Sequence, residues 1–404
     1  MSGPRLAVRI SADALRQIRG GHPWVYADAI TSISRGGSAG DLAVVFDDRR
    51  RFAAIGLYDP DSPIRIKILH HGDPTPIDRA WWIRQVSGAM ERRSALAQDQ
   101  ATTAWRVVHG ENDGLPGLVV DRYADTAVVK IYSAALIDHL DDIVAGVETV
   151  LHPARIVLRA SRQVVGRLPG RWAAGTVVGH SPTGPIEYRE LGLTFAADVV
   201  RGQKTGAFLD QRDNRALVAR HAAGRSVLDV FCCTGGFAVH AAAGGAGAVH
   251  LVDQSAGAID TARANLDRNG ATAAVTSTVG DAFATMEHLV RQRKRFGVVV
   301  IDPPSFAPNQ AAVPAARHAY RRLTRLGIQL VEPGGVLFQA SCSSRIGRDE
   351  FVTLANEEIK RSGARFDRLA QTGHPLDHPI GFAQGAYLKA LLGRVGDHRH
   401  GRAR

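Results

Sequence analysis

The sequence predicts an α/β protein whose C-terminal half is a doubly wound parallel sheet, preceded by two smaller regions that contain strands. Short apolar strands alternate with helical patterns from about residue 200 onward, as in a sheet covered by helices on both faces. Before that point, the secondary-structure pattern changes near residue 75 from short strands to a mixture of helices and strands. The length of 404 residues is enough for two or three domains.

Residues 1–75 are expected to form a small β-rich barrel with basic edges. Turns rich in Gly and Pro separate strand-like segments, which are "DLAVVFDD", "RFAAIGLYD" and "SPIRIKIL". The stretch Gly36 to Gly40 matches the G-x-S-x-G pattern of hydrolases. It lies in a turn, however, without the preceding strand and following helix that such a nucleophile requires, so a hydrolase is not indicated.

The second region, residues 78–197, has a mixed α+β pattern. Two segments with a helical period are "IDRAWWIRQVSGAMERRSALAQ" and "LIDHLDDIVAGVETVL". Strands follow at "RIVLRAS" and "IEYRELGLTFAADV", and the Asp-Gly and Pro-Gly pairs near residue 115 mark turns.

The third region, residues 200–394, contains the predicted parallel sheet. Its five strand candidates are "SVLDVF", "AVHLVD", "AAVTSTV", "GVVVID" and "VLFQAS". Ser255 is placed to cap the helix "SAGAIDTARANLDRNG", and Gly270 lies just past its end. "AYLKALLG" is expected to be the last strand. The polar residues 395–404 are expected to form a disordered basic tail.

Composition indicates a cytoplasmic protein with a polyanionic partner. The net charge of +11 favours binding to nucleic acid, although a base composition that encodes Arg in place of Lys also produces such an excess. Three cysteines in 404 residues do not make a disulfide framework. The sequence contains no run of about 18 apolar residues, so a membrane span is not predicted. The first residues lack the apolar core of a secretory signal.

Acidic residues follow three successive predicted strands, where ligands bind in an open parallel sheet. Asp229 lies in the first strand, and Thr234-Gly235-Gly236 opens the next helix, where glycines let the backbone approach a ligand. Asp253 ends the second strand and can accept ribose hydroxyls. Asp281 follows the third and can meet an adenine amino group. Without G-x-G-x-x-G the pattern favours S-adenosylmethionine over a dinucleotide.

Two further motifs follow the fourth and fifth strands. "DPPSF", Asp302 to Phe306, is a stiff loop that can hold an acid and an aromatic face against a planar base. Cys342, in "SCSS", follows the fifth strand in the same crevice. A thiolate there can attack C6 of a pyrimidine and make C5 nucleophilic toward a methyl group, whereas the alternative is a buried, inert cysteine.

The other two cysteines, Cys232 and Cys233, stand in "VLDVFCCTGGFAVHAA". Their spacing is not C-x-x-C, and no cluster of partners accompanies them, so no metal site is predicted. We interpret them as small packing residues beside the cofactor turn.

The chain resembles the bacterial 23S ribosomal RNA large subunit methyltransferase I family, which makes 5-methylcytosine, and its archaeal relatives. The resemblance covers nearly the whole chain, and "GQKTGAFLDQRDNR" is its most specific piece. The other matching pieces are "HPWVY", "GENDGLPGLVVDRY", "TGGFAV", "DPPSF", "SCS", "DHP" and "YLK".

The resemblance implies a PUA domain at 1–75, an α+β central domain and a Rossmann-like class I methyltransferase domain. It implies S-adenosylmethionine as cofactor, ribosomal RNA (23S or a large-subunit precursor) as partner, no membrane and no metal. It also implies catalytic roles for Cys342 and Asp302, with Arg212 flanking the cofactor site. The residues it implies for cofactor binding are Gln211, Phe231, Thr234, Gly235, Gly236, Asp253, Gln254, Asp281, Asp302 and Pro303.

This sequence departs from the family in two places. Cys232-Cys233 stands where the family has a Ser or Tyr-like pair. Pro304 and Ser305 stand where other RNA cytosine methyltransferases carry a second cysteine, so the base that removes the C5 proton is unassigned. A guanine-N7 or other N-methyltransferase, a non-catalytic RNA-binding assembly factor and a homodimeric state all remain open, as does the modified nucleotide.

Overall fold

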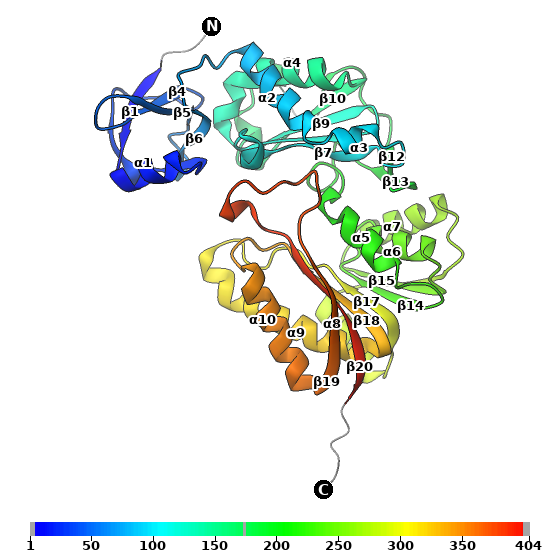
Figure 1. Cartoon of the computed structure of the whole chain (residues 1–404). Coiled ribbons are helices and arrows are strands. Elements are labelled where there is room, and N and C mark those ends of the chain that lie inside the picture. The colour runs from blue at the N-terminus through cyan, green and yellow to red at the C-terminus, as the bar shows by residue number, and fades with distance from the viewer. Residues whose placement is uncertain (1–4, 173–174, 399–404) are drawn as a thin grey trace. The chain divides into compact units, whose positions relative to one another are not determined.

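A computed structural model describes residues 5–172 and 175–398 of the chain (Figure 1). The chain divides into two compact units. The first comprises the residues up to Gly192 together with Ala196–Leu209 and Leu376–Gly385. The second comprises Leu193–Phe195, Asp210–Pro375 and the residues from Ala386 onward. None of the described helices combines the length and the hydropathy needed to cross a bilayer.

The N-terminal part of the first unit is a six-stranded mixed sheet in the order β2-β6-β5-β4-β1-β3. β1 pairs in parallel with β4, and the other pairs are antiparallel. Ser11 caps α1, whose Leu15 and Ile18 pack into the core of this sheet. The elements are β1 (Leu6–Ile10), α1 (Ala12–Arg19), β2 (Trp24–Tyr26), the 3₁₀ helix η1 (Ala27–Ala29), β3 (Ile30–Ile33), β4 (Leu42–Phe46), β5 (Phe52–Tyr58) and β6 (Ile64–His71).

The rest of the first unit is built on a five-stranded sheet in the order β11-β10-β9-β8-β7. Its helices are α2 (Arg79–Glu91), α3 (Ser94–Gln98), η2 (Gly110–Asp113), η3 (Ala134–His139), α4 (Leu140–Leu151), η4 (Val165–Arg167) and η5 (Gly170–Trp172). Its strands are β7 (Ala104–His109), β8 (Leu118–Tyr123), β9 (Thr126–Ile131), β10 (Arg155–Ala160) and β11 (Gly175–Val178), followed by the separate hairpin of β12 (Ile186–Glu190) and β13 (Leu193–Ala197).

One face of the five-stranded sheet carries the core of this part. In β9, Ala127, Val129 and Ile131 pack with Trp82 of α2 and Val147 of α4. Side chains alternate along a strand, so the residues between them point to the opposite face.

A late segment of the chain belongs to the first unit. Leu376–Gly385 was expected within a continuous methyltransferase region, but buried hydrogen bonds tie it to the second region instead. Nη2 of Arg93 donates to the carbonyl oxygen of Asp377 at 2.9 Å, and Oδ2 of Asp377 accepts from the backbone N of Arg106 at 2.9 Å. No local sequence pattern marks such long-range pairings.

The second unit contains a seven-stranded sheet in the order β16-β15-β14-β17-β18-β20-β19. Figure 1 shows α5, α6 and α7 on one side of this sheet and α8, α9 and α10 on the other. The strands are β14 (Ser226–Val230), β15 (Ala248–Asp253), β16 (Ala274–Val279), β17 (Phe296–Ile301), β18 (Val331–Ser341), β19 (Ala364–Thr372) and β20 (Lys389–His398). The helices are η6 (Leu209–Gln211), α5 (Arg212–Ala219), α6 (Gly236–Ala243), α7 (Ala256–Arg268), α8 (Ala282–Arg291), η7 (Gln310–Ala312), α9 (Val313–Leu330), α10 (Arg348–Ser362) and η8 (Ala383–Gly385), the last of which lies in the first unit.

The five predicted parallel strands are present, and the doubly wound fold is confirmed. Ser255 caps α7 as expected, with its Oγ accepting from the backbone N of Ala258 at 3.2 Å. Two features at the C-terminal edge differ from expectation. β19 was not anticipated, and β20 continues to His398 through residues that were expected in a disordered tail. Antiparallel pairing with β19 holds this polar stretch in the sheet, with Val395 opposite Phe366 and His398 opposite Ala364. Residues 399–404 of the expected tail lie outside the described residues.

Candidate active site

The carboxyl ends of the parallel strands gather most of the side chains that the sequence singled out. β14 pairs in parallel with β15 and β17, β15 with β16, and β17 with β18. Parallel strands end at the same edge of a sheet, so the residues that follow them share that edge. These residues are Phe231, Asp253, Asp281, Asp302 and Cys342.

The turn after β14 follows a left-handed backbone path. Phe231, Cys233 and Gly235 have φ values of 63°, 48° and 77°, which cost a non-glycine residue about 1–3 kcal/mol each. A Cβ on Gly235 would lie 2.7 Å from the Cβ of Ala262, and one on Gly236 would lie 2.4 Å from Nε of Arg215. The protein's own packing therefore requires a glycine at Gly235, whereas a side chain at Gly236 would displace the end of the Arg215 side chain. The sequence had suggested only that these glycines make room for a ligand.

Asp229 is the buried acid of this turn. Its side chain is fully buried, and Oδ2 accepts from the backbone N of Ala238 at 3.1 Å. Burial raises its pKa to about 7. Within the described part of the chain, Oδ1 has no hydrogen-bond partner. A buried acceptor of this kind calls for a polar partner, and the attractive charge that acts on this carboxyl is that of Arg215.

The next two acids are already engaged with the backbone. Oδ2 of Asp253 accepts from the backbone N of Cys233 at 3.0 Å, and Oδ1 accepts from that of Ser255 at 2.9 Å. Each oxygen retains a lone pair for a ribose hydroxyl. Asp281 is exposed and caps α8 through Oδ1, 2.8 Å from the backbone N of Ala284. Gln254, beside Asp253, is exposed.

Asp302 is held by a chain of hydrogen bonds. Nε2 of Gln211 donates to Oδ1 of Asp302 at 2.7 Å, and Nδ2 of Asn214 donates to Oε1 of Gln211 at 2.6 Å. Oγ1 of Thr372 donates to Oδ1 of Asn214, also at 2.6 Å. Burial, followed by the charge of Asp210, raises the pKa of Asp302 to about 7. This carboxyl can therefore hold a proton near neutral pH.

The ring of Phe306 does not stand free beside Asp302. It packs with the rings of Tyr320, Phe283 and Phe231, at centroid distances of 5.3, 6.2 and 6.5 Å. Phe306 is half-buried, and its role as an aromatic face for a planar base stays a prediction. Core packing turns the ring toward other aromatic side chains, which suits its large apolar area.

Cys342 lies directly after β18 and against the "DPPSF" loop. Its half-buried Sγ is 3.7 Å from the carbonyl oxygen of Pro303. The buried serines on either side, Ser341 and Ser343, each place Oγ 2.8 Å from the hydroxyl of Tyr320. This hydroxyl cluster holds the backbone on both sides of the thiol.

Lys389, the first residue of β20, is a site residue that sequence reasoning missed. The residue is buried, with 2 % of its surface exposed. Nζ donates to the carbonyl oxygens of Ser343 at 2.5 Å and Tyr387 at 3.0 Å. Burial lowers its pKa to about 8, and Cys342 is the strongest opposing influence. The sequence shows this lysine in the motif "YLK" but assigns it no role, because only the pairing of β20 with β18 brings it close to Cys342.

The adjacent pair Cys232 and Cys233 has a different environment. Burial raises the pKa of both thiols, and a thiol that keeps its proton is a poor nucleophile. Both are free cysteines. These properties fit packing residues.

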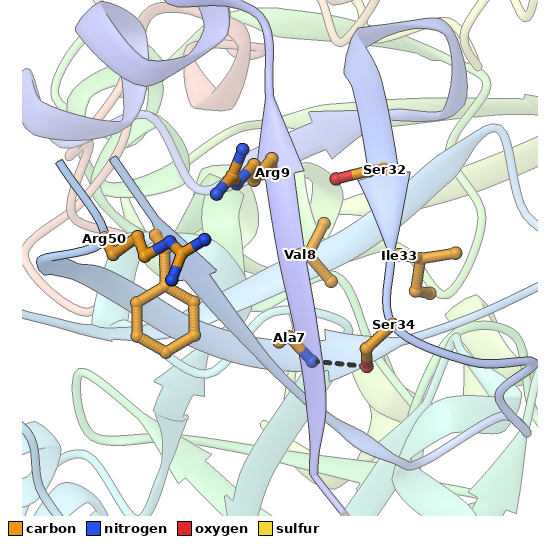
Figure 2. Close-up of a pocket in the computed structure, with 8 residues that line it drawn as sticks. Ala7, Val8, Arg9, Ser32, Ile33, Ser34 and Arg50 are labelled. Atoms are coloured by element: carbon orange, nitrogen blue, oxygen red, sulfur yellow. Dashed lines mark hydrogen bonds between the residues drawn. The ribbon is translucent and has the colours of Figure 1, made fainter. Parts of the chain in front are cut away.

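Two further features lie outside this edge. Among the described residues, no group of three or more His, Cys, Asp or Glu side chains is placed to hold a metal ion. Figure 2 shows a pocket of the six-stranded sheet that is lined by residues of β1 and β3 and by Phe46 and Arg50. Its volume is about 340 Å³. None of the predicted site residues lines this cavity.

Family models match most of the chain. The model described as S-adenosylmethionine-dependent methyltransferase matches residues 115–394, and the one described as a PUA-like domain matches residues 8–71.

Curated relatives match over nearly their whole length. A ribosomal RNA large subunit methyltransferase of Deinococcus radiodurans is 41% identical over 398 residues, which is 97% of this chain and 98% of the relative. Ribosomal RNA large subunit methyltransferase I of Shewanella denitrificans is 35% identical, over 96% of this chain and 99% of the relative.

Solved structures share the fold. A protein from Streptococcus mutans, assigned to the S-adenosylmethionine-dependent methyltransferases, superposes with a TM-score of 0.83 at 20% identity, over 96% of this chain and 100% of the other. A second structure, assigned as a methyltransferase and complexed with SAH, has a TM-score of 0.81 at 21% identity, over 97% and 100%. The chain therefore belongs to the family of the ribosomal RNA large subunit methyltransferases and is an S-adenosylmethionine-dependent methyltransferase with a PUA-like N-terminal domain.

Proposed function

We propose that this protein methylates C5 of a cytidine in large-subunit ribosomal RNA, with Cys342 as the nucleophile. The observation that carries the proposal is the position of the Cys342 thiol, 3.7 Å from the carbonyl oxygen of Pro303, the residue that directly follows Asp302. A C5 methyltransferase needs a thiol and a proton donor on the same base. The names of the relatives support ribosomal RNA as the substrate class.

The proposed reaction assigns each step to a side chain of this chain. The Cys342 thiolate adds to C6 of a cytidine that is flipped or single-stranded. Asp302, which can hold a proton near neutral pH, donates to N3 and offsets the charge that develops on the ring. S-adenosylmethionine, when bound, supplies the methyl group to C5. A base that is not yet assigned, or water, then takes the C5 proton, the Cys342 thiolate is eliminated from C6, and N3 returns its proton to Asp302, which releases the product.

The acids at the strand ends would hold the cofactor. Asp253 would accept ribose hydroxyls, Asp281 would meet the adenine amino group, and Gln211 would fix the carboxyl of Asp302. The proposal also places Phe231, Thr234, Gly235 and Pro303 in the cofactor site, in the turn after β14 and the loop after β17.

Lys389 would keep Cys342 in its reactive form. A cation next to a thiol favours the thiolate, and the Lys389 ammonium is anchored to the carbonyl oxygen of the residue after Cys342. We assign Lys389 as a positioning residue, because it acts through the cysteine.

The test is covalent trapping. Ribosomal RNA that contains 5-fluorocytidine should form a stable adduct with the wild-type protein, because fluorine blocks loss of the C5 substituent. Cys342→Ala should abolish both the adduct and methyl transfer while S-adenosylmethionine binding, measured by calorimetry, is retained. Methylation by Cys342→Ala, or transfer without any adduct, would point to an N-methyltransferase. Absence of cofactor binding by the wild type would point to a non-catalytic RNA-binding factor.

The same proposal includes a cytoplasmic location, because large-subunit ribosomal RNA is made and assembled there, and a naked RNA or an assembling particle as substrate. Mass mapping of ribosomal RNA from a deletion strain would identify the modified nucleotide. Sedimentation of the purified protein would show whether it is a homodimer.

A further inference from the structure

Two cations stand side by side on the second sheet of the first unit. In the parallel pairing of β9 and β10, Lys130 is directly opposite Arg159. Both point away from the face that packs against α2 and α4, because Val129, Ile131 and Leu158 occupy that face. Like charges directly opposite on adjacent strands destabilise a sheet. This arrangement therefore needs a compensating partner.

A third cation extends the pair. Nζ of Lys130 donates to the carbonyl oxygen of Lys204 at 2.7 Å, and Lys204 holds a left-handed backbone with a φ of 54°. Burial, followed by the charges of Arg159 and Lys204, lowers the pKa of Lys130 to about 8. Within the described part of the chain, no carboxylate lies within ion-pair distance of these three side chains.

The acids nearest to this cluster are already committed. Asp121 accepts from Nε and Nη2 of Arg106, at 2.8 and 3.0 Å, and from Oγ1 of Thr205 at 2.5 Å. Asp198 accepts from the backbone N of the residues two and three positions later, at 3.0 and 2.8 Å. Both carboxylates still attract the cluster, Asp121 acting on Lys130 and Asp198 on Arg159, but neither forms an ion pair with it.

Arg159 has an unmet hydrogen-bonding requirement. In the described structure its Nη1 is buried without a hydrogen-bond partner, and burial lowers its pKa. A buried donor on a charged group is costly to leave unsatisfied, and the Arg159 residue as a whole is only half-buried. Beside the cluster, the ring of Tyr132 is 45% exposed, with Nζ of Lys130 5.3 Å from its centroid.

We propose that Lys130, Arg159 and Lys204 bind a phosphodiester of the RNA substrate on this face of the central sheet, with Tyr132 as a stacking surface for an adjacent base. The inference rests on the proposed function for the choice of RNA as the source of the phosphate. A guanidinium fork and two ammonium groups match phosphate geometry and charge, and an exposed aromatic ring beside them is typical of single-strand binding.

The experiment measures RNA affinity against salt concentration. The full-length protein is titrated with a short single-stranded RNA of mixed sequence and with a 23S ribosomal RNA transcript. Lys130→Gln and Arg159→Gln should each reduce the slope of log K against log salt by about 0.7, the value for one phosphate contact on a single strand. Each should also weaken binding about fourfold at about 0.15 M salt, the effect to which a slope change of about 0.7 corresponds. Tyr132→Ala should weaken binding without changing the slope.

Two control variants separate this role from a structural one. Arg122→Gln removes the same charge from the opposite face, where the guanidinium lies 5.3 Å from the ring of Trp105, and should leave the slope unchanged. Arg159→Lys keeps the charge and should keep the slope. Lys130→Gln should not lower the thermal midpoint, because it removes a repulsion.

Unchanged slopes in both glutamine variants, with wild-type folding, would overturn the inference. The inference would also fail if the glutamine variants lost binding of inorganic phosphate, measured at constant ionic strength, while the RNA slope stayed unchanged. The site would then bind a free anion. If the wild type failed to methylate any ribosomal RNA, the proposed function would fail while the slope comparison would still decide this inference.

Discussion

Replacing Lys389 with methionine should reduce methyl transfer strongly while changing stability little. The pKa of this lysine falls from 10.5 to about 8 in the fold. A drop of about 2.5 in pKa, at about 1.4 kcal/mol for each unit, corresponds to about 3 kcal/mol of penalty on the charged form. Because the folded pKa is depressed, the fold is destabilised by this full penalty below pH 8, where the lysine is charged in both states. The penalty is lost as the pH rises from 8 to 10.5 and the lysine loses its charge.

Methionine has a similar length and no charge, so Lys389→Met removes that penalty at pH 7. It also leaves the carbonyl oxygens of Ser343 and Tyr387 without the ammonium donor, which costs about 1–3 kcal/mol. The two effects oppose each other, so we expect the free energy of unfolding at pH 7 to change by no more than about 2 kcal/mol. Urea denaturation measures this change.

The activity of the same variant should fall about 100-fold or more, because a positioned charge at the nucleophile is lost. Alkylation of Cys342 by iodoacetamide at pH 7, followed by mass spectrometry, should slow as the thiolate fraction falls. Lys360→Met, at an exposed position of α10, is the matched control and should behave like the wild type. Wild-type kcat/KM and wild-type alkylation of Cys342 in the Lys389→Met variant would refute the reasoning.

Three further substitutions test the same site. Asp302 must be protonated to donate to N3 and has a pKa of about 7, so kcat/KM should fall as the pH rises through 7. Asp302→Asn should lose this fall in the pH profile. A fall that persists in the variant would exclude Asp302 as its origin. Tyr320→Phe removes two hydrogen bonds of 2.8 Å beside the nucleophile and should cost about 1–3 kcal/mol in urea denaturation; a cost below about 0.5 kcal/mol would show that the hydroxyl cluster is not structural. Cys232→Ala should retain methylation within a few-fold in a radiolabelled-methyl assay, because burial keeps the Cys232 thiol protonated; loss of turnover with intact folding would return this cysteine to the reaction.

The sequence alone determined the five parallel strands and the chemistry at their ends. A run of apolar residues that ends in an acid predicts a buried parallel strand with a polar edge, and this pattern is sufficient to assign Asp253, Asp302 and Cys342 to the ligand-binding edge of the sheet. These inferences work because strand burial and the chemistry of a strand end are local properties.

Only the tertiary structure decided which side chains meet. The hydrogen bond from Gln211 to Asp302 joins residues 91 positions apart, and the one from Lys389 to the Ser343 carbonyl joins residues 46 apart. The register that sets Lys130 against Arg159 depends on the pairing of two strands, and a shift of one residue would turn one of them to the other face. Pairing over such separations is fixed by the packing of the whole sheet, which also extended β20 to His398.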